Sequence, residues 1–436
     1  MSKEKSIVPE LRFPKFEKNW MYEPFSEIYA FLTTNSFSRA KLNYEKGNVK
    51  NIHYGDIHTK FSTLFDISTE DVPYVNPDIS LKKIKKENYC QVGDIVFADA
   101  SEDLDDVGKS IEIINLDKEK LLAGLHTLLA RQNSPRKLIT GFGGFLFKSP
   151  GIRSQIKREA QGAKVLGISG TRLLTINVFY PDNESEQQKI ADCLSSLDAL
   201  IAAHRDKLDA LRAHKKGLMQ NLFPQEGETV PRYRFEGFEG AWGSEPLQEI
   251  CKLVRGPFGG ALKKEIFVEE GYAVYEQSHA IYSDFSNFRY RINDEKYHEL
   301  KRFSVRASDL IMSCSGTMGK FSMIPSDFEE GVINQALLKL TVKTGYDVLF
   351  IKTSLETETN QKKLLSQSAG GAIKNVVSVS QIRILELSVP RLKEQQKIAE
   401  CLSTVDELIT AQEDRIAQLQ EHKRGLMQGL FPKTNG

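Results

Sequence analysis

One stretch of 39 residues occurs twice in this chain. Residues Glu186–Pro224 (EQQKIADCLSSLDALIAAHRDKLDALRAHKKGLMQNLFP) match residues Glu394–Pro432 (EQQKIAECLSTVDELITAQEDRIAQLQEHKRGLMQGLFP) without a gap, at an offset of 208 positions (394 − 186). By direct count, 24 of the 39 aligned positions are identical, which chance does not explain. The chain therefore carries an internal repeat, and its fold has to place the same long segment twice.

A shorter repeat precedes each variable stretch. Leu11–Ile28 (LRFPKFEKNWMYEPFSEI) matches Tyr233–Ile250 (YRFEGFEGAWGSEPLQEI) at an offset of 222 (233 − 11). Between the repeats, short β-branched and aromatic runs such as GDIVFA, LLTINVFY and DLIMSC are separated by Gly, Asn, Asp and Pro. We therefore expect two α+β domains of one fold, at about residues 20–185 and 242–393.

The long repeated segment has the periodicity of a coiled-coil helix. Its apolar positions step by 4, 3, 4, 3, which is a heptad seam, and both copies have polar residues at the fifth and eighth seam positions: His204 and Lys215, then Gln412 and Lys423. Two helices of this length with matching stripes predict one coiled coil between the two domains. The apolar seam residues are Ile190, Leu194, Leu197, Ile201, Leu208, Leu211, Leu218, Leu222, Ile398, Leu402, Val405, Ile409, Ile416, Leu419, Leu426 and Leu430.

Composition limits the class of protein. The 436 residues suit two or three domains, and 59 Lys and Arg almost balance 58 Asp and Glu, so any basic surface has to be local. We find neither a signal peptide nor a stretch of the roughly 18 apolar residues that a membrane span needs, and we expect a cytoplasmic protein. Five cysteines without a Cys-x-x-Cys pair favour reduced thiols over disulfides or zinc.

Motifs for catalysis are missing. A dinucleotide-binding loop at GFGGF (Gly141–Phe145) would need a preceding strand and an acidic residue about 20 positions on, and the chain there has the basic, helix-like stretch GIRSQIKREAQG. VGKS (Val107–Ser110) has Asp103 where a phosphate loop has its first Gly. The stretch VNPDIS (Val75–Ser80) lacks the Asn/Asp-Pro-Pro-aromatic loop of adenine-N6 methyltransferases. We predict no catalytic residue, no metal site and no bound cofactor.

Basic residues cluster with aromatic residues inside both variable stretches. Any single cluster is more often a solvated face, but several together predict a positive surface that duplex DNA would fill with its phosphates. The candidate DNA-binding residues are Lys82, Lys83, Lys85, Lys86, Arg131, Arg136, Lys137, Arg153, Lys157 and Arg158 in the first domain, and Arg255, Lys263, Lys264, Arg289, Arg291, Lys301, Arg302, Lys320 and Lys374 in the second.

The repeated lead-in, the repeated Glu-Gln-Gln-Lys-Ile-Ala helix start and the repeated Gly-Leu-Met-Gln-x-Leu-Phe-Pro helix end together resemble the specificity (S) subunit of type I restriction–modification systems. The resemblance covers essentially the whole chain. It implies two target-recognition domains, each reading half of a bipartite DNA site, separated by an antiparallel coiled coil that sets the spacer. The implied organisation is 1–19 lead-in, 20–185 first domain, 186–224 first helix, 225–241 linker with the second lead-in, 242–393 second domain, 394–432 second helix and 433–436 tail.

The resemblance also implies a division of labour. Two modification subunits would bind S-adenosylmethionine and methylate adenine N6, and two restriction subunits would supply ATP- and Mg-dependent cleavage. The low similarity between the two domains favours an asymmetric site. Two other readings stay open: a solitary restriction–methylation enzyme, for which a catalytic loop is lacking, and a scaffold in which the coiled coil spaces two protein-binding domains.

Overall fold

The computed structural model describes residues 8–258, 260–366 and 379–433. Their contacts divide the chain into two compact units, which we call unit 1 and unit 2. Unit 1 combines residues up to Arg205 with residues from Asp414 onward, and unit 2 comprises Asp206–Glu413. Each unit therefore contains one variable domain, the first half of one long helix and the second half of the other.

Unit 1 contains two principal sheets. The larger has the order β2 (Tyr29–Leu32), β11 (Thr127–Gln132), β7 (Ile95–Ala98), β9 (Ser110–Asn115) and β5 (Leu64–Asp66). The smaller has the order β10 (Leu121–Ala123), β4 (Lys50–Ile52), β6 (Tyr74–Val75) and β3 (Leu42–Asn43), with β10 and β4 parallel. Strand pairs β1 (Met21–Pro24) with β13 (Asn177–Tyr180) and β8 (Ala100–Ser101) with β12 (Leu166–Gly167) complete the unit.

Unit 2 repeats this topology. Its first sheet runs β15 (Cys251–Arg255), β22 (Leu337–Val342), β19 (Leu310–Ser313) and β20 (Phe321–Met323). Its second runs β21 (Gly331–Ile333), β17 (Tyr272–Tyr275), β18 (Arg291–Ile292) and β16 (Phe267–Val268), again with the first two strands parallel. The pair β14 (Gly243–Pro246) with β23 (Glu386–Val389) corresponds to β1 with β13. Apart from β5 and the β8–β12 pair, which have no counterpart among the described strands of unit 2, these sheets have the same strand order as those of unit 1, so the two α+β domains share one fold, as predicted.

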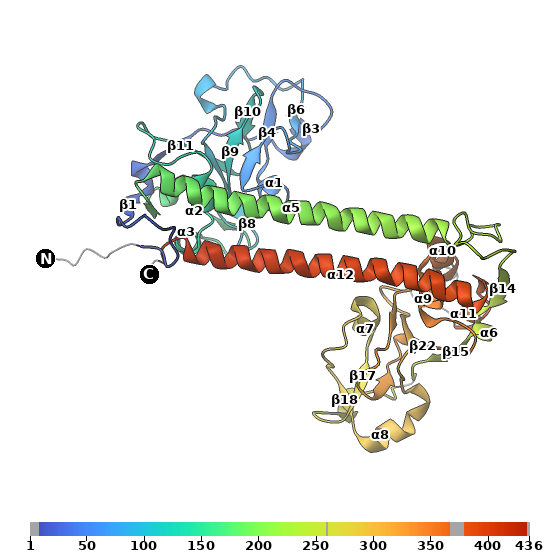
Figure 1. Cartoon of the computed structure of the whole chain (residues 1–436). Coiled ribbons are helices and arrows are strands. Elements are labelled where there is room, and N and C mark those ends of the chain that lie inside the picture. The colour runs from blue at the N-terminus through green and yellow to red at the C-terminus, as the bar shows by residue number, and fades with distance from the viewer. Residues whose placement is uncertain (1–7, 259, 367–378, 434–436) are drawn as a thin grey trace. The chain divides into compact units, whose positions relative to one another are not determined.

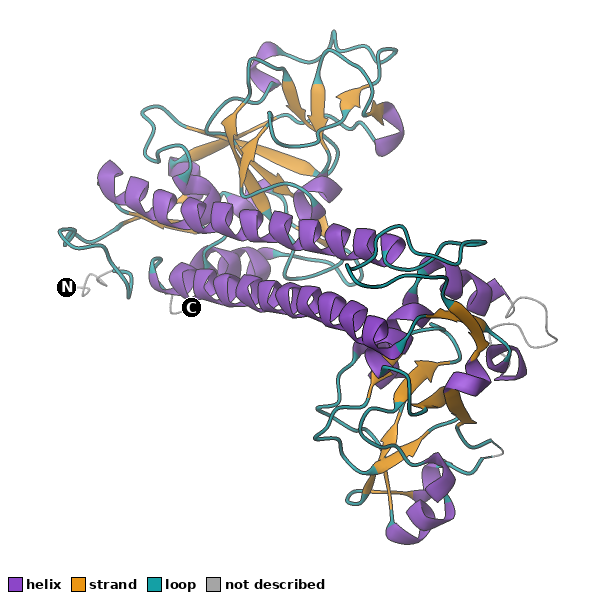
Figure 2. Cartoon of the chain, turned by 45° about the vertical axis from the view of Figure 1, so that its right-hand side comes forward, coloured by secondary structure: helices purple, strands orange, loops and turns teal. Residues whose placement is uncertain are grey.

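Short helices cover the sheets in both units (Figure 2). Unit 1 has α1 (Tyr54–Thr59), α2 (Phe142–Leu146), α3 (Pro150–Glu159) and α4 (Gly170–Leu173). Unit 2 has α6 (Leu247–Ile250), α7 (Gln277–Tyr282), α8 (Asp294–Glu299), α9 (Val348–Glu356), α10 (Glu358–Ser366) and α11 (Val379–Arg383). Single 3₁₀ turns lie at Phe25–Glu27, Arg39–Lys41, Lys86–Asn88, Lys264–Ile266 and Lys301–Phe303.

The repeated segments form the two long helices α5 (Glu184–Asn221) and α12 (Leu392–Gly429), drawn green and red in Figure 1. In unit 1, Leu197 and Ile201 of α5 pack against Leu419 of α12. In unit 2, Arg212 pairs with Glu413 at 2.6 Å and Lys215 with Asp406 at 2.5 Å. As residue numbers rise in one helix they fall in the other, so the helices are antiparallel, and the predicted fold class is confirmed.

Part of the predicted seam packs between the helices, at Leu197, Ile201 and Leu419, whereas Ile190 and Leu194 belong to the domain core of unit 1 and Ile398 and Leu402 to that of unit 2. The apolar residues of the seam are buried, except for Leu211, Leu218, Ile409 and Leu426, which are half-buried. The polar seam lysines sit at the edge, where Lys215 pairs with Asp406 and Lys423 pairs with Asp198, the equivalent partner in the other repeat. Long side chains at these positions thus satisfy their charge across the helix pair.

The repeated Glu-Gln at each helix start fixes the lead-in segment to the helix. In unit 1, Glu186 accepts from Arg12 at 2.8 and 2.9 Å and from the Trp20 indole N–H at 3.2 Å. Gln187 donates to the carbonyl of Pro181 and accepts from the amide of Ile139. Because a buried carboxylate needs a cation and hydrogen-bond donors, this arrangement explains why the same lead-in and the same helix start occur together.

Unit 2 contains the same arrangement. Glu394 accepts from Arg234 at 2.8 and 2.9 Å and from the Trp242 indole at 3.3 Å. Gln395 donates to Pro390 and accepts from the amide of Asp347. The two latches, Arg12–Glu186–Trp20 and Arg234–Glu394–Trp242, are therefore equivalent structural elements.

The phenylalanine of the repeated Leu-Phe-Pro sequence, just after each long helix, packs into the hydrophobic core of its unit. In unit 1, Phe431 meets Trp20 edge-on at 6.1 Å between ring centroids and lies 5.9 Å from Phe142. In unit 2, Phe223 packs in the same way against Trp242 and Phe350. Both long helices end three residues before the predicted ends at Pro224 and Pro432, because the chain turns there to insert these aromatic rings.

The glycine-rich stretch GFGGF also has a structural role. Gly141, with φ +95°, precedes α2, and the amides of Gly141 and Gly144 donate to the buried carboxylate of Glu112 at 2.8 and 2.7 Å. Burial raises the pKa of Glu112 to about 7. The stretch therefore binds a side chain of its own domain.

Candidate nucleic-acid interface

The four lysines of the run LKKIKKENY lie on the surface of unit 1. Lys82, Lys83, Lys85 and Lys86 are all exposed in the connection between β6 and β7. The ion pair of Lys85 with Glu87, at 3.4 Å, is exposed on both sides and is therefore weak. These four side chains remain predicted phosphate contacts, and the structure leaves them accessible for that role.

Other predicted residues of unit 1 have internal partners. Arg131 forms a bidentate pair with the buried Asp94, at 2.8 and 2.6 Å, and donates to two backbone carbonyls. Lys137 pairs with Glu23, and Lys157 pairs with Asp105. These side chains stabilise connections within the domain, and a DNA contact would compete with those pairs.

The remaining three candidate DNA-binding residues of unit 1 differ in exposure. Arg153 is half-buried and donates to the carbonyls of Asp105 and Val107. Arg136 is exposed and donates to the carbonyl of Val92 at 3.1 Å, while Arg158 is exposed on α3.

In unit 2 most of the predicted residues are exposed. Arg291 is half-buried and has partners within the domain: it pairs with Glu329 and donates to the carbonyl of Gly271. Lys301 donates to the Tyr297 hydroxyl at 3.1 Å and lies 4.3 Å from the centre of that ring. The exposed residues are Lys263, Lys264, Arg289, Lys301, Arg302 and Lys320, and Lys374 lies outside the described residues.

Arg255 differs from the other candidates. It ends β15, its guanidinium carbon lies 5.8 Å from the centre of the Phe258 ring, and that ring is 70% exposed. Its Nε and Nη1 atoms are enclosed without a hydrogen-bond partner among the described residues. The exposed Phe258 ring is open to stack on a base, whereas the two enclosed Arg255 donors would reach a ligand only after the side chain moves.

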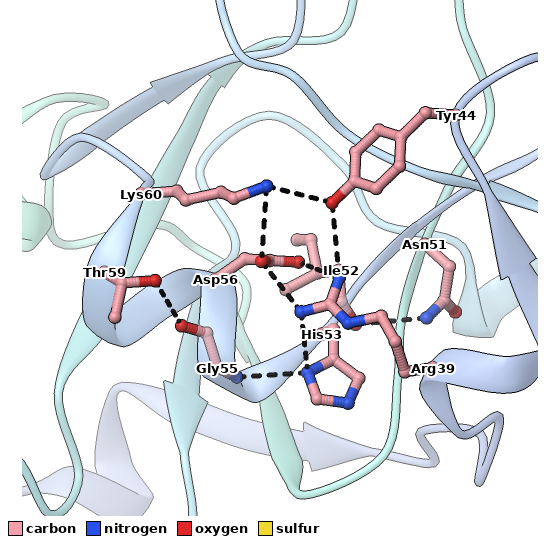
Figure 3. Close-up of polar contacts among 9 residues, drawn as sticks. All are labelled: Arg39, Tyr44, Asn51, Ile52, His53, Gly55, Asp56, Thr59 and Lys60. Carbon is pink, nitrogen blue, oxygen red and sulfur yellow. Dashed lines mark hydrogen bonds and ion pairs between the residues drawn. The ribbon is translucent and has the colours of Figure 1, made fainter. Parts of the chain in front are cut away.

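The structure brings together a further basic cluster that sequence reasoning missed (Figure 3). Arg39, in the connection between β2 and β3, makes a bidentate ion pair with the buried Asp56 of α1, both bonds at 2.8 Å. Tyr44 accepts from Lys60 at 3.0 Å and from Arg39 at 3.3 Å. Burial and the Arg39 charge lower the pKa of His53, whose Nδ1 accepts from the Gly55 amide at 3.2 Å.

This cluster holds the connection after β2 against α1 and leaves cations at the surface. The side chains of Arg39 and Lys60 are each 46% exposed, and Tyr44 is 45% exposed. No run of basic residues marks the cluster in the sequence, because its members come from separate segments that meet only in the fold. In unit 2 the topologically equivalent connection, after β15, carries Arg255, Phe258, Lys263 and Lys264.

Three other features bear on possible chemistry. Within residues 8–258, 260–366 and 379–433, no group of three or more His, Cys, Asp and Glu side chains is placed to hold a metal ion. All five cysteines are free, and burial raises the pKa of Cys251 to about 12. None of the helices in this part of the chain combines the length and the apolar character that crossing a membrane requires.

Comparison with known proteins decides the family. The family model described as "Type I restriction modification DNA specificity domain" matches residues 43–213 and again residues 240–421. The chain belongs to the type I restriction–modification specificity (S) subunit family. Each match covers most of one variable domain and the long helix that follows it, in agreement with the repeat in the sequence.

Two curated S subunits of Methanocaldococcus jannaschii are similar along most of the chain. The putative type I restriction enzyme MjaX specificity subunit is 25% identical over 394 residues, which cover 86% of this chain and 85% of that protein. The type I restriction enzyme MjaVIII specificity subunit is 22% identical over 337 residues, covering 74% and 76%.

Solved structures show the same fold. The S subunit of a type I restriction–modification system from M. genitalium superposes with a TM-score of 0.58 at 14% identity and covers 98% of this chain and 100% of that one. A chain from a structural study of complex assembly and conformational transition in the type I R-M system gives a TM-score of 0.59 at 14% identity, covering 96% and 99%.

Proposed function

We propose that this S subunit binds a bipartite, asymmetric DNA site, with the domain of unit 1 reading one half and the domain of unit 2 reading the other. The observation that carries the proposal is the common sheet order of two domains whose surfaces differ. In unit 1 the connection after β2 presents Arg39 beside Tyr44 and Lys60 from later segments, whereas in unit 2 the end of β15 and the connection after it present Arg255 and Phe258. One scaffold with two sets of surface side chains is what two different half-sites require.

Phosphate contacts would supply affinity, and side chains on the connections would supply sequence preference. The exposed lysines between β6 and β7 suit phosphates, because flexible ammonium groups act as point charges. Arginines suit base edges in the major groove, because a guanidinium can donate twice to guanine. Arg39 and Arg255 are the candidates for that role in the two domains: a base contact would have to replace the Asp56 pair of Arg39 and would require the enclosed donors of Arg255 to turn outward.

The reactions would be carried out by partner subunits. In this proposal two modification subunits bind S-adenosylmethionine and methylate adenine N6, and two restriction subunits cleave DNA with ATP and Mg. This chain contributes recognition, the spacer helices α5 and α12, and docking surfaces. The proposed role places it in the cytoplasm of a bacterial or archaeal cell, where the DNA lies.

The test is a map of N6-methyladenine across DNA from cells that express the chain with its modification subunit. Cells that lack the chain but express the same modification subunit are the control. A split motif that appears only with the chain supports the proposal and reveals both half-sites and the spacer. If both subunits are expressed and the complex forms, and no new motif appears, the proposed function is wrong.

A further inference from the structure

A short turn joins the two principal sheets of unit 1. It comprises residues 124–126, between β10 of the smaller sheet and β11 of the larger sheet. The amide of Gly124 donates to the carbonyl of Ile52, and the amide of Asp99 donates to the carbonyl of His126, both at 3.0 Å. Because Ile52 belongs to β4 and Asp99 directly follows β7, the turn is fixed to both sheets where they meet.

The equivalent turn of unit 2 is closed by the same two bonds. Residues 334–336 lie between β21 and β22. The amide of Asn334 donates to the carbonyl of Tyr275, and the amide of Cys314 donates to the carbonyl of Ala336, both at 2.9 Å. These bonds make Ala336 the counterpart of His126, so the two turns occupy the same place in the fold.

The side chains that the two turns expose are different. In unit 1 the exposed residue is His126, whose side chain is 50% exposed. In unit 2 it is Gln335, which is exposed and has no side-chain hydrogen-bond partner among the described residues. One position in the common fold therefore presents an imidazole in one domain and a carboxamide in the other.

His126 is held in place by its surroundings. Its φ of +55° lies in the left-handed region, which residues with a side chain rarely adopt. Its Nδ1 atom lies 3.1 Å from Oδ1 of Asp99, and its ring meets that of Tyr54 at 5.3 Å between centroids. Such backbone conformations concentrate at functional sites, whereas glycine would adopt this one without strain. A histidine here therefore indicates a use for the side chain itself.

Asp99 determines what the exposed edge of the His126 ring offers to a ligand. A carboxylate can only accept a hydrogen bond, so the hydrogen of the neutral imidazole is on Nδ1, which faces Asp99. The Nε2 atom is then an acceptor, and it has no partner among the residues that the structure describes. An exposed acceptor in a fixed ring suits a ligand group that donates.

His126 belongs to the same surface as the basic cluster of Figure 3. The Tyr54 ring that it meets lies 4.7 Å, between centroids, from the ring of His53. The Nη2 atom of Arg39 in turn lies 3.4 Å from Nδ1 of His53. This surface combines exposed cations, which suit phosphates, with one fixed acceptor. In the major groove, the groups that donate to an acceptor are the amino groups of adenine and cytosine.

We propose that His126 is a specificity-determining residue of unit 1, whose Nε2 accepts from the exocyclic amino group of an adenine or a cytosine in the major groove. Asp99 is the positioning residue that keeps Nε2 an acceptor. In unit 2, Gln335 at the equivalent turn reads a base of the other half-site, as a carboxamide that both donates and accepts. The inference rests on the proposed function, because it assigns base contacts within the same two domains.

The test removes single amino groups from the DNA. Methylation mapping first gives the half-sites. Each adenine is then replaced in turn by purine deoxyriboside and each cytosine by 2-pyrimidinone deoxyriboside, which lack the amino group. The Kd of every duplex is measured for the full chain in complex with the modification subunit, as the parent and as His126→Gly. The matched control is His298→Asn, because His298 is also exposed and pairs with an aspartate, Asp294, at 3.5 Å.

We expect the parent to lose about tenfold or more in affinity when the amino group that His126 reads is removed, as for one good base contact. At that position His126→Gly should bind the natural and the altered duplex within about twofold, while it keeps the sensitivity of the parent elsewhere. The control should match the parent at every position. If His126→Gly keeps the sensitivity of the parent at every position, the inference is overturned and the proposed function stands. If mapping yields no half-sites, both fail.

Gln335→Ala provides the complementary measurement in unit 2. It should change the amino-group sensitivity in the half-site that His126→Gly leaves unchanged. A change in the same half-site as for His126→Gly would contradict the assignment of one turn to each half-site.

Two further readouts separate a base contact from a structural role. His126→Gly places glycine in a conformation that it adopts readily, so its thermal unfolding temperature should be no lower than that of the parent although its base discrimination is lost. Asp99→Asn has the same size but can also donate to Nδ1, so it permits the other tautomer and should weaken the discrimination. In ¹⁵N NMR of the histidine-labelled parent, the His126 hydrogen should be on Nδ1. A hydrogen on Nε2 would overturn the acceptor role.

Discussion

The latch of unit 1 offers a quantitative test of how the lead-in segment stabilises the domain. Glu186 is 2% exposed and Arg12 is 13% exposed, and the carboxylate accepts two bonds from Arg12 and one from Trp20. Removing either partner leaves an uncompensated charge in a buried place, which costs about 3 kcal/mol or more. Replacing both by apolar residues of similar size removes the uncompensated charge and is often nearly neutral.

We therefore predict strong non-additivity between Arg12→Met and Glu186→Met. Each single substitution should lower the free energy of unfolding by about 3 kcal/mol. The double variant should lose only about 1 to 2 kcal/mol, because the charge pair is gone and what remains is the buried Trp20 N–H without its acceptor. For a denaturant slope of about 2 kcal/mol/M, a single substitution moves the urea midpoint by about 1.5 M.

The chain provides its own probe for this measurement. It has two tryptophans, one in each latch, so a Trp242→Phe background leaves Trp20 as the reporter of unit 1. Lys433→Met is the matched control, because the Lys433–Glu10 pair is exposed on both sides and its loss should leave the urea midpoint almost unchanged. Additive single effects, or single effects no larger than that of the control, would refute the reasoning.

Three further predictions follow from other parts of the structure. Burial raises the pKa of Glu112 to about 7 from 4.5, so between these pH values the folded chain keeps a proton that the unfolded chain releases. The free energy of unfolding should therefore fall from about pH 4.5 to pH 7 and then level off. In a pH series of urea melts, Glu112→Gln should remove this fall. Replacing Lys82, Lys83, Lys85 and Lys86 by Ala should weaken DNA binding on all sequences and reduce the slope of log K against log salt by up to about 3 to 4 in a salt titration; an unchanged slope would exclude these phosphate contacts. Deleting one heptad from both α5 and α12 shortens each helix by about 10 Å, so methylation mapping should show an altered spacer or no motif. An unaltered spacer would contradict the claim that the two helices set the distance between the half-sites.

The long helices and the repeat could be predicted because their signal is local. A heptad pattern over ten seam positions specifies a helix and its buried face without knowledge of the partner. The last residue of each helix was harder to predict, because Phe223 and Phe431 leave the helix to enter hydrophobic cores that form only in the folded units. The heptad pattern does not show at which residue the chain leaves the helix.

The sheet order and most of the site could not be predicted, because both depend on non-local contacts. Strands of two to six residues pair with partners far along the chain, as β4 does with β10. The charge runs located the exposed lysines between β6 and β7 but gave no indication that Arg131 is paired with Asp94. Arg39 and Lys60 are 21 residues apart in the sequence (60 − 39), and the fold brings them to one surface.

The central claim, that each domain reads one half of the DNA site, is tested most directly by exchanging one domain. Residues 20–185 are replaced by the corresponding domain of another S subunit of known specificity, and N6-methyladenine is mapped for the parent and the chimera with the same modification subunit. We predict that one half-site changes to that of the donor, while the other half-site and the spacer stay the same. A chimera that is methylation-competent and changes both half-sites, or neither, would contradict the account.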